Sequence, residues 1–292
     1  MLHFLPAPLV GAIAMLLFAA NTVFWISCFF PVVALKRVVP SPRFRERCYD
    51  LLIALAWRWV AINSWIVKLT QRLAWDVDLP QGLDPDGSYL VVCNHRSWTD
   101  IYFLQHVFRR RVPFLKFFLK RSLIWVPFLG FGWWALGFPF MHRRSLAQDM
   151  ETLRRSCDAF RRAPMSLINF LEGTRFTPDK RLAQQSPYEN LLKPRAGGAA
   201  FVMSAVADRL AGVLDVTIVY PGDPPRASIW EFLQGKIGRI VVRARLLPLP
   251  EDTLGRDPLK DREFSARMRD WANGIWQDKD RLIHDLRSAG GA

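Results

Sequence analysis

The sequence predicts an α/β fold with a mostly parallel central sheet flanked by helices and preceded by an apolar helical segment. Short apolar runs that are typical of buried strands alternate with helical periods from residue 89 to residue 286. No Asp, Glu, Lys or Arg occurs before Lys36, although the 292-residue chain has 40 Lys and Arg and a net charge of +14. Apolar residues make up 51% of the chain, which excludes a disordered polyelectrolyte.

The charge-free N-terminal segment indicates a membrane anchor. Residues 4–35 would extend about 48 Å as one helix, whereas the hydrocarbon core of a bilayer is ~30 Å thick. We therefore expect either one tilted span or two shorter helices that enter and return, with a bend near Asn21 or Pro31. A cleaved signal peptide fits less well because it requires Lys or Arg before the apolar run, and a buried helix of a soluble protein would be shorter.

Basic residues directly follow this segment, at Lys36, Arg37, Arg43, Arg45 and Arg47. By the positive-inside rule, this flank and the rest of the chain face the cytoplasm. A second apolar stretch, residues 51–67, contains one Arg and three Trp and is expected to lie in the membrane interface as an amphipathic helix. The predicted division is an anchoring helical region over residues 1–67 and a globular domain over residues 68–292.

Strands and helices alternate in the predicted globular domain. Strands are expected over residues 89–93, 166–170, 216–220 and 240–247. Helices are expected over residues 101–108, 146–162, 197–210 and 261–286. The four cysteines are scattered and form no CxxC pair, so neither a disulfide framework nor a zinc site is predicted.

A motif with catalytic potential, residues 94–100 (NHRSWTD), directly follows the first predicted strand. Open α/β sheets place their functional sites at such strand ends. A neutral His95 can accept a proton near pH 7, and Asp100, about one helical turn further on, can fix its tautomer and stabilise the imidazolium. The alternative is a histidine packed beside a helix N-cap. Ser97 is expected to cap the helix, since no Gly-x-Ser-x-Gly elbow surrounds it.

Two further segments supply candidate phosphate ligands. Residues 170–175 (FLEGTR) also follow a predicted strand. Gly173 and Thr174 are expected to expose backbone N–H groups there, and Arg175 offers a planar fork of donors, which together suit a phosphate ester. Residues 137–143 (GFPFMHR) add Arg143 after an apolar run. Taken singly, either arginine is more often a solvated surface charge than a ligand.

These blocks and their order resemble the glycerolipid acyltransferases. The pair His95 and Asp100 comes first, then residues 137–143, 172–175 and 213–221. The chain is most similar to the 1-acylglycerol-3-phosphate (lysophosphatidate) acyltransferases and other lysophospholipid acyltransferases, and the fold implied is a glycerolipid-acyltransferase-like domain.

Two other stretches, residues 172–177 (EGTRFT) and 190–198 (NLLKPRAGG), resemble the YihG-like branch of the bacterial inner membrane. Two positions depart from the family pattern, because Leu171 and Asp215 stand where the family commonly has Pro. Both could reshape the acceptor pocket.

The resemblance implies a membrane-bound acyltransferase whose catalytic domain is residues 68–292. His95 would deprotonate the free glycerol hydroxyl of a lysophospholipid, and that oxygen would attack the thioester of acyl-CoA or acyl carrier protein. The acceptor implied first is 1-acylglycerol-3-phosphate, which gives phosphatidic acid; lysophosphatidylinositol, lysophosphatidylglycerol and lysocardiolipin are the alternatives. No metal or other cofactor is implied, since a thioester is already activated.

The same resemblance implies the roles of the remaining site residues. Asp100 would orient His95, and the acceptor phosphate would be held by Gly173, Thr174, Arg175 and Arg143. Glu172 would hydrogen-bond the acceptor or brace Arg175. A non-catalytic membrane scaffold with this fold is the competing class, and the presence of every proposed catalytic residue weighs against it.

A basic, Phe-rich run covers residues 108–121. We expect it to bind an anionic bilayer, although the same cations could meet the phosphates of CoA, the acidic face of acyl carrier protein, or solvent alone. Nucleic acid is not a predicted partner, because no recognition motif accompanies the charge.

Overall fold

The computed structural model describes residues 4–142, 146–221 and 228–289. The chain forms two compact units, each built from separate stretches of sequence. The first unit contains Met1–Leu73, Phe117–Asp149 and Trp230–Lys236, and the second contains the rest of the chain. The first unit therefore takes in two segments of the predicted globular domain, and a division of the chain at residue 67 stays a prediction.

The first unit is mainly helical. Its elements are α1 (Ala7–Ser27), α2 (Phe29–Val38), α3 (Pro42–Thr70), β4 (Leu119–Lys120), the 3-10 helix η1 (Arg121–Trp125), α5 (Leu129–Ala135), β5 (Phe140–Met141) and most of α9 (Ile229–Leu233). Helices α1 and α2 are interrupted at Cys28. Pro31 explains the position of this break, because it lacks the N–H that would bond to the carbonyl of Ser27. Of the two predicted bend positions, the structure has the one near Pro31.

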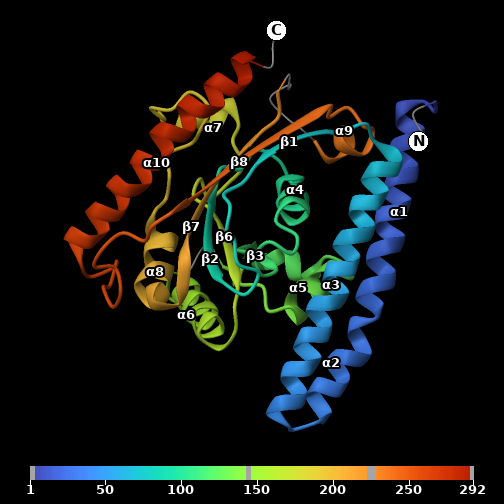
Figure 1. Cartoon of the computed structure of the whole chain (residues 1–292), viewed down its shortest axis with the longest axis horizontal. Helices are drawn as coiled ribbons and strands as arrows, with labels where there is room; N and C mark the ends of the chain where they lie inside the picture. The colour runs from blue at the N-terminus through green and yellow to red at the C-terminus, as the bar shows by residue number, and fades with distance from the viewer. Residues whose placement is uncertain (1–3, 143–145, 222–227, 290–292) are drawn as a thin grey trace. The chain divides into compact units, whose positions relative to one another are not determined.

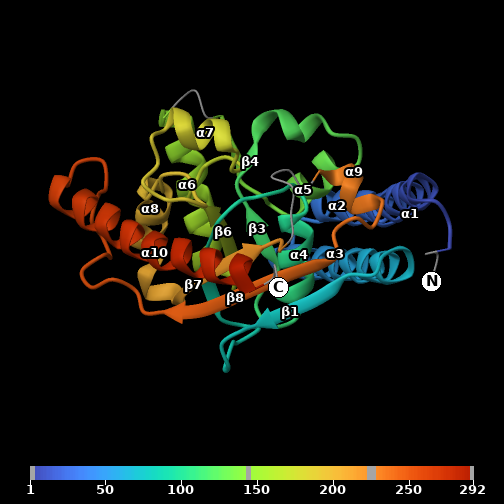
Figure 2. The same ribbon diagram turned by 90° about the horizontal axis from the view of Figure 1, so that it is seen from above.

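The chain reverses between α2 and α3, and α1 and α3 lie side by side (Figures 1 and 2). Asn21 donates to the side chain of Asn63 (2.8 Å) and to the carbonyl of Trp59 (3.1 Å). The indole of Trp59 donates in return to the hydroxyl of Thr22 (3.1 Å). Because these polar groups lie between apolar helix faces, they fix the register of the antiparallel pair.

Two helical segments of this unit, Ala7–Val38 and Pro42–Thr70, are long and apolar enough to cross a membrane. The stretch over residues 51–67, predicted to lie in the membrane interface, is thus part of a 29-residue helix with the length of a span. The prediction that residues 4–35 could enter and return on their own is wrong, since Pro31 interrupts the helix without reversing it and the partner helix is α3.

The second unit is an α/β layer structure. Its elements are β1 (Ala74–Asp78), β2 (Ser88–Cys93), α4 (Asp100–Val107), β3 (Leu115–Phe117), α6 (Leu146–Arg162), β6 (Ser166–Phe170), α7 (Pro178–Ala183), α8 (Gly197–Val206), the 3-10 helix η2 (Ala207–Arg209), β7 (Leu210–Val219), β8 (Arg239–Leu247) and α10 (Arg262–Ala289); β3 and α6 each begin or end in the first unit. The strand order is β1-β8-β7-β2-β6-β3. The pairs β1/β8, β2/β6 and β2/β7 are parallel and β7/β8 is antiparallel, which confirms a mostly parallel sheet.

Helices cover both faces of this sheet, with α8 and α10 on one side and α4 on the other (Figure 1). Every residue of β2 is buried, as expected for a central parallel strand. Side chains of β7 alternate between the faces: Asp215 and Thr217 contact α10, whereas Tyr220, just after the strand, packs against Phe103 of α4. The sheet thus brings the carboxyl ends of β2, β6 and β7 together at one edge.

The predicted elements match closely except near residue 210. Strands β2, β6 and β8 and helices α4 and α6 agree with prediction to within one residue. The helix predicted over residues 197–210 ends instead at Val206, and β7 begins at Leu210. Small apolar residues there suit either state, and pairing with β2, in which Gly212 lies opposite Tyr89, decides for strand.

Candidate active site

His95 and Asp100 form a close pair at the carboxyl end of β2. His95 lies two residues beyond the strand, and Asp100 is the first residue of α4. Nδ1 of His95 is 2.8 Å from Oδ2 of Asp100. The side chain of His95 is 15% exposed and that of Asp100 is fully buried. The structure therefore brings together the pair that the sequence predicted, with the imidazole on the solvent side of the carboxylate.

The other partners of Asp100 determine which ring nitrogen carries the proton. Its Oδ2 also accepts from the backbone N–H groups of Arg96 (2.7 Å) and Ser97 (2.9 Å), and its Oδ1 accepts from the hydroxyl of Tyr220. A carboxylate can only accept, so Nδ1 of His95 must be the donor. The lone pair is then on Nε2, the atom that can take a proton from a substrate.

Several contacts hold the strand end that carries His95. The side-chain amide of Asn94 donates to the carbonyl of Ile218 and accepts from its N–H, both at 2.9 Å, which extends the β2/β7 pairing. The ring of Phe170 stacks on the imidazole with 4.1 Å between centroids. The N–H of Phe176 donates to the carbonyl of His95 (2.8 Å). Little backbone freedom is left to the histidine.

Glu172 is fully buried and binds two backbone amides. Its Oε1 accepts from the N–H of His95 (2.8 Å) and its Oε2 accepts from the N–H of Leu192 (3.0 Å). Burial raises the pKa of this carboxyl to about 7, and the two backbone hydrogen bonds oppose the rise. Glu172 does not brace Arg175 in the structure, because both of its oxygens accept from backbone N–H groups and the guanidinium of Arg175 lies over Trp98 instead. Its contact with an acceptor stays a prediction.

The raised pKa of Glu172 predicts a pH-dependent stability. The unfolded chain releases this proton near the ordinary value of 4.5, whereas the folded protein keeps it up to about 7. The folded state therefore binds more protons between these values, and stability falls as pH rises through this window. The shift corresponds to about 3 kcal/mol. The free energy of unfolding of wild type minus that of Glu172→Gln should fall by roughly this amount between pH 4.5 and pH 8 in detergent.

The matched control for this measurement is Glu251→Gln, which changes an exposed carboxylate. Its stability should follow that of the wild type at every pH. Parallel curves for wild type and Glu172→Gln would show that Glu172 ionises alike in the folded and unfolded states.

Gly173 closes a turn directly after β6. Its φ of 66° lies in the left-handed region, and its N–H donates to the carbonyl of Phe170 (2.8 Å). A Cβ at this position would lie 3.2 Å from Cδ of Arg195. The turn thus already uses the Gly173 N–H, and a role of Gly173 in holding a phosphate stays a prediction.

The next two residues of the turn behave differently. The hydroxyl of Thr174 accepts from Nζ of Lys180 on α7 (2.9 Å), and Lys180 also donates to the carbonyl of Arg175 (2.9 Å). The guanidinium of Arg175 lies over the ring of Trp98, 4.9 Å from its centroid. Arg175 is exposed and Thr174 is half-buried, so the fork of donors on Arg175 is accessible. Arg143, the other predicted phosphate ligand, lies outside the described residues.

Sequence reasoning missed four contributors to this site. Tyr220 directly follows β7, and its position at a strand end before Pro221 was the signal available. The guanidinium of Arg96 donates to the carbonyl of Asn190 (3.2 Å) and lies over the ring of Phe176. Nζ of Lys180 contacts Thr174 and the carbonyl of Arg175, and Leu192 contacts Glu172 through its backbone N–H; no sequence pattern marks either contact.

The two departures from the family pattern lie inside the fold. Leu171 is fully buried. Asp215 is 4% exposed and pairs with Nζ of Lys279 on α10 (2.6 Å) and with Nε of Arg245 on β8 (2.8 Å). Because Asp215 faces α10, on the sheet face opposite Tyr220, its role is to attach that helix to the sheet.

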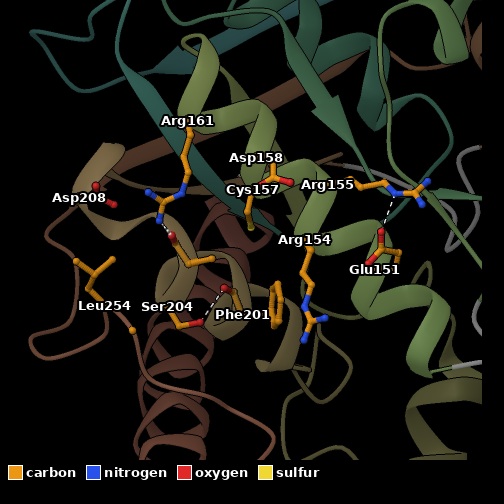
Figure 3. A pocket seen from close by; sticks show the side chains of 12 residues that line it. Glu151, Arg154, Arg155, Cys157, Asp158, Arg161, Phe201, Ser204, Asp208 and Leu254 are labelled. Atoms are coloured by element: carbon orange, nitrogen blue, oxygen red, sulfur yellow. Dashed lines mark hydrogen bonds and ion pairs between the residues drawn. The ribbon is translucent and has the colours of Figure 1, made fainter.

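A separate cleft lies between α6 and α8 and contains none of the predicted site residues (Figure 3). Charged side chains of α6 and Phe201 of α8 line it. Burial raises the pKa of Cys157 in this cleft to about 11, which makes its thiol a poor nucleophile. Within residues 4–142, 146–221 and 228–289, no group of His, Cys, Asp and Glu side chains is arranged to hold a metal ion.

Comparison with known proteins agrees with this geometry. The family model "Acyltransferase" matches residues 75–221. The 2-acyl-1-lysophosphatidylinositol acyltransferase of Saccharomyces cerevisiae is 27% identical over 257 residues, which cover 69% of this chain and 62% of the yeast protein. The 1-acyl-sn-glycerol-3-phosphate acyltransferase 3 of Arabidopsis thaliana is 30% identical over 179 residues, 56% of this chain and 47% of the plant protein. The chain thus spans less than two thirds of either relative.

A solved structure shares the fold over nearly the whole chain. It is the 1-acyl-sn-glycerophosphate (LPA) acyltransferase PlsC of Thermotoga maritima, with a TM-score of 0.58, 15% sequence identity, and coverage of 96% of this chain and 97% of that one. The YihG-like branch stays a prediction. Since the family model extends from β1 to the end of β7 and includes His95, Asp100 and Glu172, this chain belongs to the acyltransferase family.

Proposed function

We propose that the protein transfers an acyl chain from a thioester to the free glycerol hydroxyl of a lysophospholipid, with His95 as the general base. The first acceptor is 1-acylglycerol-3-phosphate, and the product is phosphatidic acid. The observation that carries this proposal is the 2.8 Å pair of His95 and Asp100, with the backbone N–H of His95 bound by Glu172 of the EGTR turn. One carboxylate thus connects the proton acceptor to the turn that presents Arg175.

The chemistry needs one proton acceptor and one electrophile. Nε2 of His95 removes the hydroxyl proton as the glycerol oxygen attacks the thioester carbonyl carbon. The tetrahedral intermediate then collapses, the C–S bond breaks, and the imidazolium returns its proton to the leaving thiolate. Asp100 stabilises the imidazolium between these steps. Acyl-CoA or acyl carrier protein is the donor, and neither a metal nor a further cofactor takes part.

Arg175 and Thr174 are proposed to hold the acceptor phosphate, together with Arg143. The stacking of Arg175 on Trp98 orients the guanidinium plane before a ligand arrives, which lowers the entropy lost on binding. Thr174 accepts from Lys180 and keeps its own hydroxyl proton to donate.

We further propose that the protein is located in the bacterial inner membrane with the catalytic unit facing the cytoplasm. Support comes from the two helices that are long and apolar enough to cross a membrane and from Lys36 and Arg37 at the end of α2. Membrane lipids are then both the surroundings and the acceptor pool.

An acyl-transfer assay of the purified full chain tests the proposal. Acyl-CoA and acyl carrier protein thioesters are each offered with lysophosphatidate, lysophosphatidylinositol, lysophosphatidylglycerol and lysocardiolipin, and products are identified by mass spectrometry. Highest kcat/KM with lysophosphatidate is expected. Preference for lysophosphatidylinositol, the acceptor named for the yeast relative, would assign that lipid as the acceptor instead of lysophosphatidate. If no acceptor receives an acyl chain, the proposal is overturned.

Replacing Arg175 by alanine should mainly raise the acceptor KM. A guanidinium–phosphate contact is worth about 1.5–3 kcal/mol, so a rise of roughly 10- to 100-fold is expected with the KM for the thioester unchanged. Arg175→Lys keeps the charge but loses the planar fork of donors, so its acceptor KM should lie between those of the wild type and Arg175→Ala. Arg262→Ala removes an exposed charge at the start of α10 and should change neither constant. An unaltered acceptor KM in Arg175→Ala would assign the phosphate to other residues.

A further inference from the structure

The C-terminal helix α10 holds the backbone of residues 188–192, here called the brace segment. The carboxylate of Asp280 accepts from the N–H groups of Glu189 (2.9 Å) and Asn190 (2.7 Å). The indole of Trp276 donates to the carbonyl of Leu192 (3.1 Å). Trp276 is fully buried, and Asn190 is 3% exposed. These bonds attach three backbone groups of the brace segment, which is neither helix nor strand, to one helix.

The opposite side of the brace segment contacts the residues around His95. Leu192 donates its N–H to Glu172, and Glu172 accepts from the N–H of His95 through its other oxygen. The carbonyl of Asn190 accepts from Arg96, the residue that follows His95. The brace segment therefore contacts α10 on one side. On the other side it contacts Glu172, which binds the N–H of His95, and Arg96, which follows His95 in the chain.

Helix α10 is itself held firmly on the sheet. Lys279, adjacent to Asp280, has a fully buried side chain and pairs with Asp215 at 2.6 Å. Its ammonium also donates to the hydroxyl of Thr217 (3.1 Å) and to the carbonyl of Val216 on β7. A buried ammonium with these partners cannot shift without leaving an uncompensated charge. The helix is thus a rigid support for the brace segment.

We infer that α10 positions His95 for catalysis through the brace segment, with Asp280 and Trp276 as positioning residues. This inference rests on the proposed function, because it assigns a task in the same reaction. Neither residue touches the reacting atoms. Their effect is to fix the orientation of Leu192 N–H and Asn190 C=O, and through Glu172 and Arg96 the orientation of the imidazole, where a displacement of about 1 Å can cost 100-fold in rate.

The isosteric substitution Asp280→Asn tests the inference. Each carboxylate oxygen accepts from one N–H, and an amide replaces one acceptor by a donor that faces a donor. The kcat of the full-length protein in detergent should fall about 10-fold or more, while the KM for acceptor and thioester changes less than about 2-fold. Hydrogen–deuterium exchange should speed up in peptides covering residues 188–192 and residues 94–100.

Asp285→Asn is the matched control, since Asp285 is an exposed carboxylate on the same helix with the same change of charge. It should leave kcat and exchange as in the wild type. Trp276→Phe removes the indole N–H and replaces the buried indole by the smaller phenyl ring, so its melting temperature is measured with kcat; it supplies a second test that does not depend on the folding of Asp280→Asn. A kcat fall of about 3- to 10-fold is expected there.

The outcomes separate this inference from the proposed function. If the wild-type protein transfers no acyl chain, the proposed function is contradicted. The exchange data would still report whether α10 orders residues 94–100. Active wild type with unchanged kcat in both Asp280→Asn and Trp276→Phe overturns the inference. Faster exchange confined to residues 188–192, with residues 94–100 unaffected, also overturns it, because the brace segment would then not transmit order to His95.

Discussion

Replacing His95 by alanine is expected to lower kcat by about 10²- to 10⁴-fold, the usual contribution of a positioned general base. The imidazole is removed but Asp100, Glu172 and the backbone around position 95 stay in place, so binding of acceptor and thioester should persist. The KM values should change only a few-fold. Steady-state transfer of a radiolabelled acyl group by purified protein in detergent measures both constants.

His106→Gln is the control for loss of a histidine from the same unit. His106 is partly buried and stacks on Trp75 with 4.3 Å between ring centroids, so it packs α4 against β1 and lies away from the strand end that carries the site. His106→Gln should lower the melting temperature, whereas its effect on kcat should be small. Normal transfer by His95→Ala would exclude the proposed mechanism.

The pairing of His95 with Asp100 was predictable because its signal is local. His95 and Asp100 are five residues apart. A strand ends just before His95 and a helix begins at Asp100, and this local arrangement largely fixes the geometry of the pair. The turn after β6 was predictable for the same reason. Both segments follow buried apolar strands, and the carboxyl ends of parallel neighbours lie at one sheet edge.

The support of the pair was not predictable, because it is made by long-range contacts to backbone atoms. Glu172 binds an N–H that is 77 residues away in sequence, and Tyr220 reaches Asp100 across 120 residues. Such contacts depend on how strands pair and leave no periodicity. The sequence suggested Arg175 as the partner of Glu172 because charge is visible in a sequence, whereas a buried backbone amide is not.

The same limit explains the error near residue 210. Residues 210–214 have a composition that suits a close-packed helix as well as a strand, and only pairing with β2 distinguishes the two. In the first unit, Pro31 marked the interruption between α1 and α2 correctly. The pairing of Asn21 with Asn63 lies 42 residues apart in the chain and could not be derived from either apolar stretch alone.

Replacing Asp100 by asparagine should lower kcat almost as much as loss of the histidine, by about 10²- to 10⁴-fold. The amide keeps the shape of the carboxylate but cannot stabilise an imidazolium, and it can present a donor to Nδ1, which then favours the tautomer with the proton on Nε2. In that tautomer the ring cannot accept the hydroxyl proton. Tyr220→Phe, which removes the hydroxyl bonded to Oδ1 of Asp100, keeps the charge and should cost only about 3- to 10-fold.

A double-substitution cycle separates this catalytic effect from a structural one. Asp100 also accepts from the backbone N–H groups of Arg96 and Ser97, so Asp100→Asn is expected to lower the melting temperature as well as kcat. If Asp100 acts through His95, adding Asp100→Asn to His95→Ala should lower kcat no further, because the residue it serves is already absent. If the two losses multiply instead, Asp100 contributes to the rate independently of the imidazole, and the pair is not a functional unit. Melting temperatures measured alongside kcat show how much of the loss is unfolding at the assay temperature.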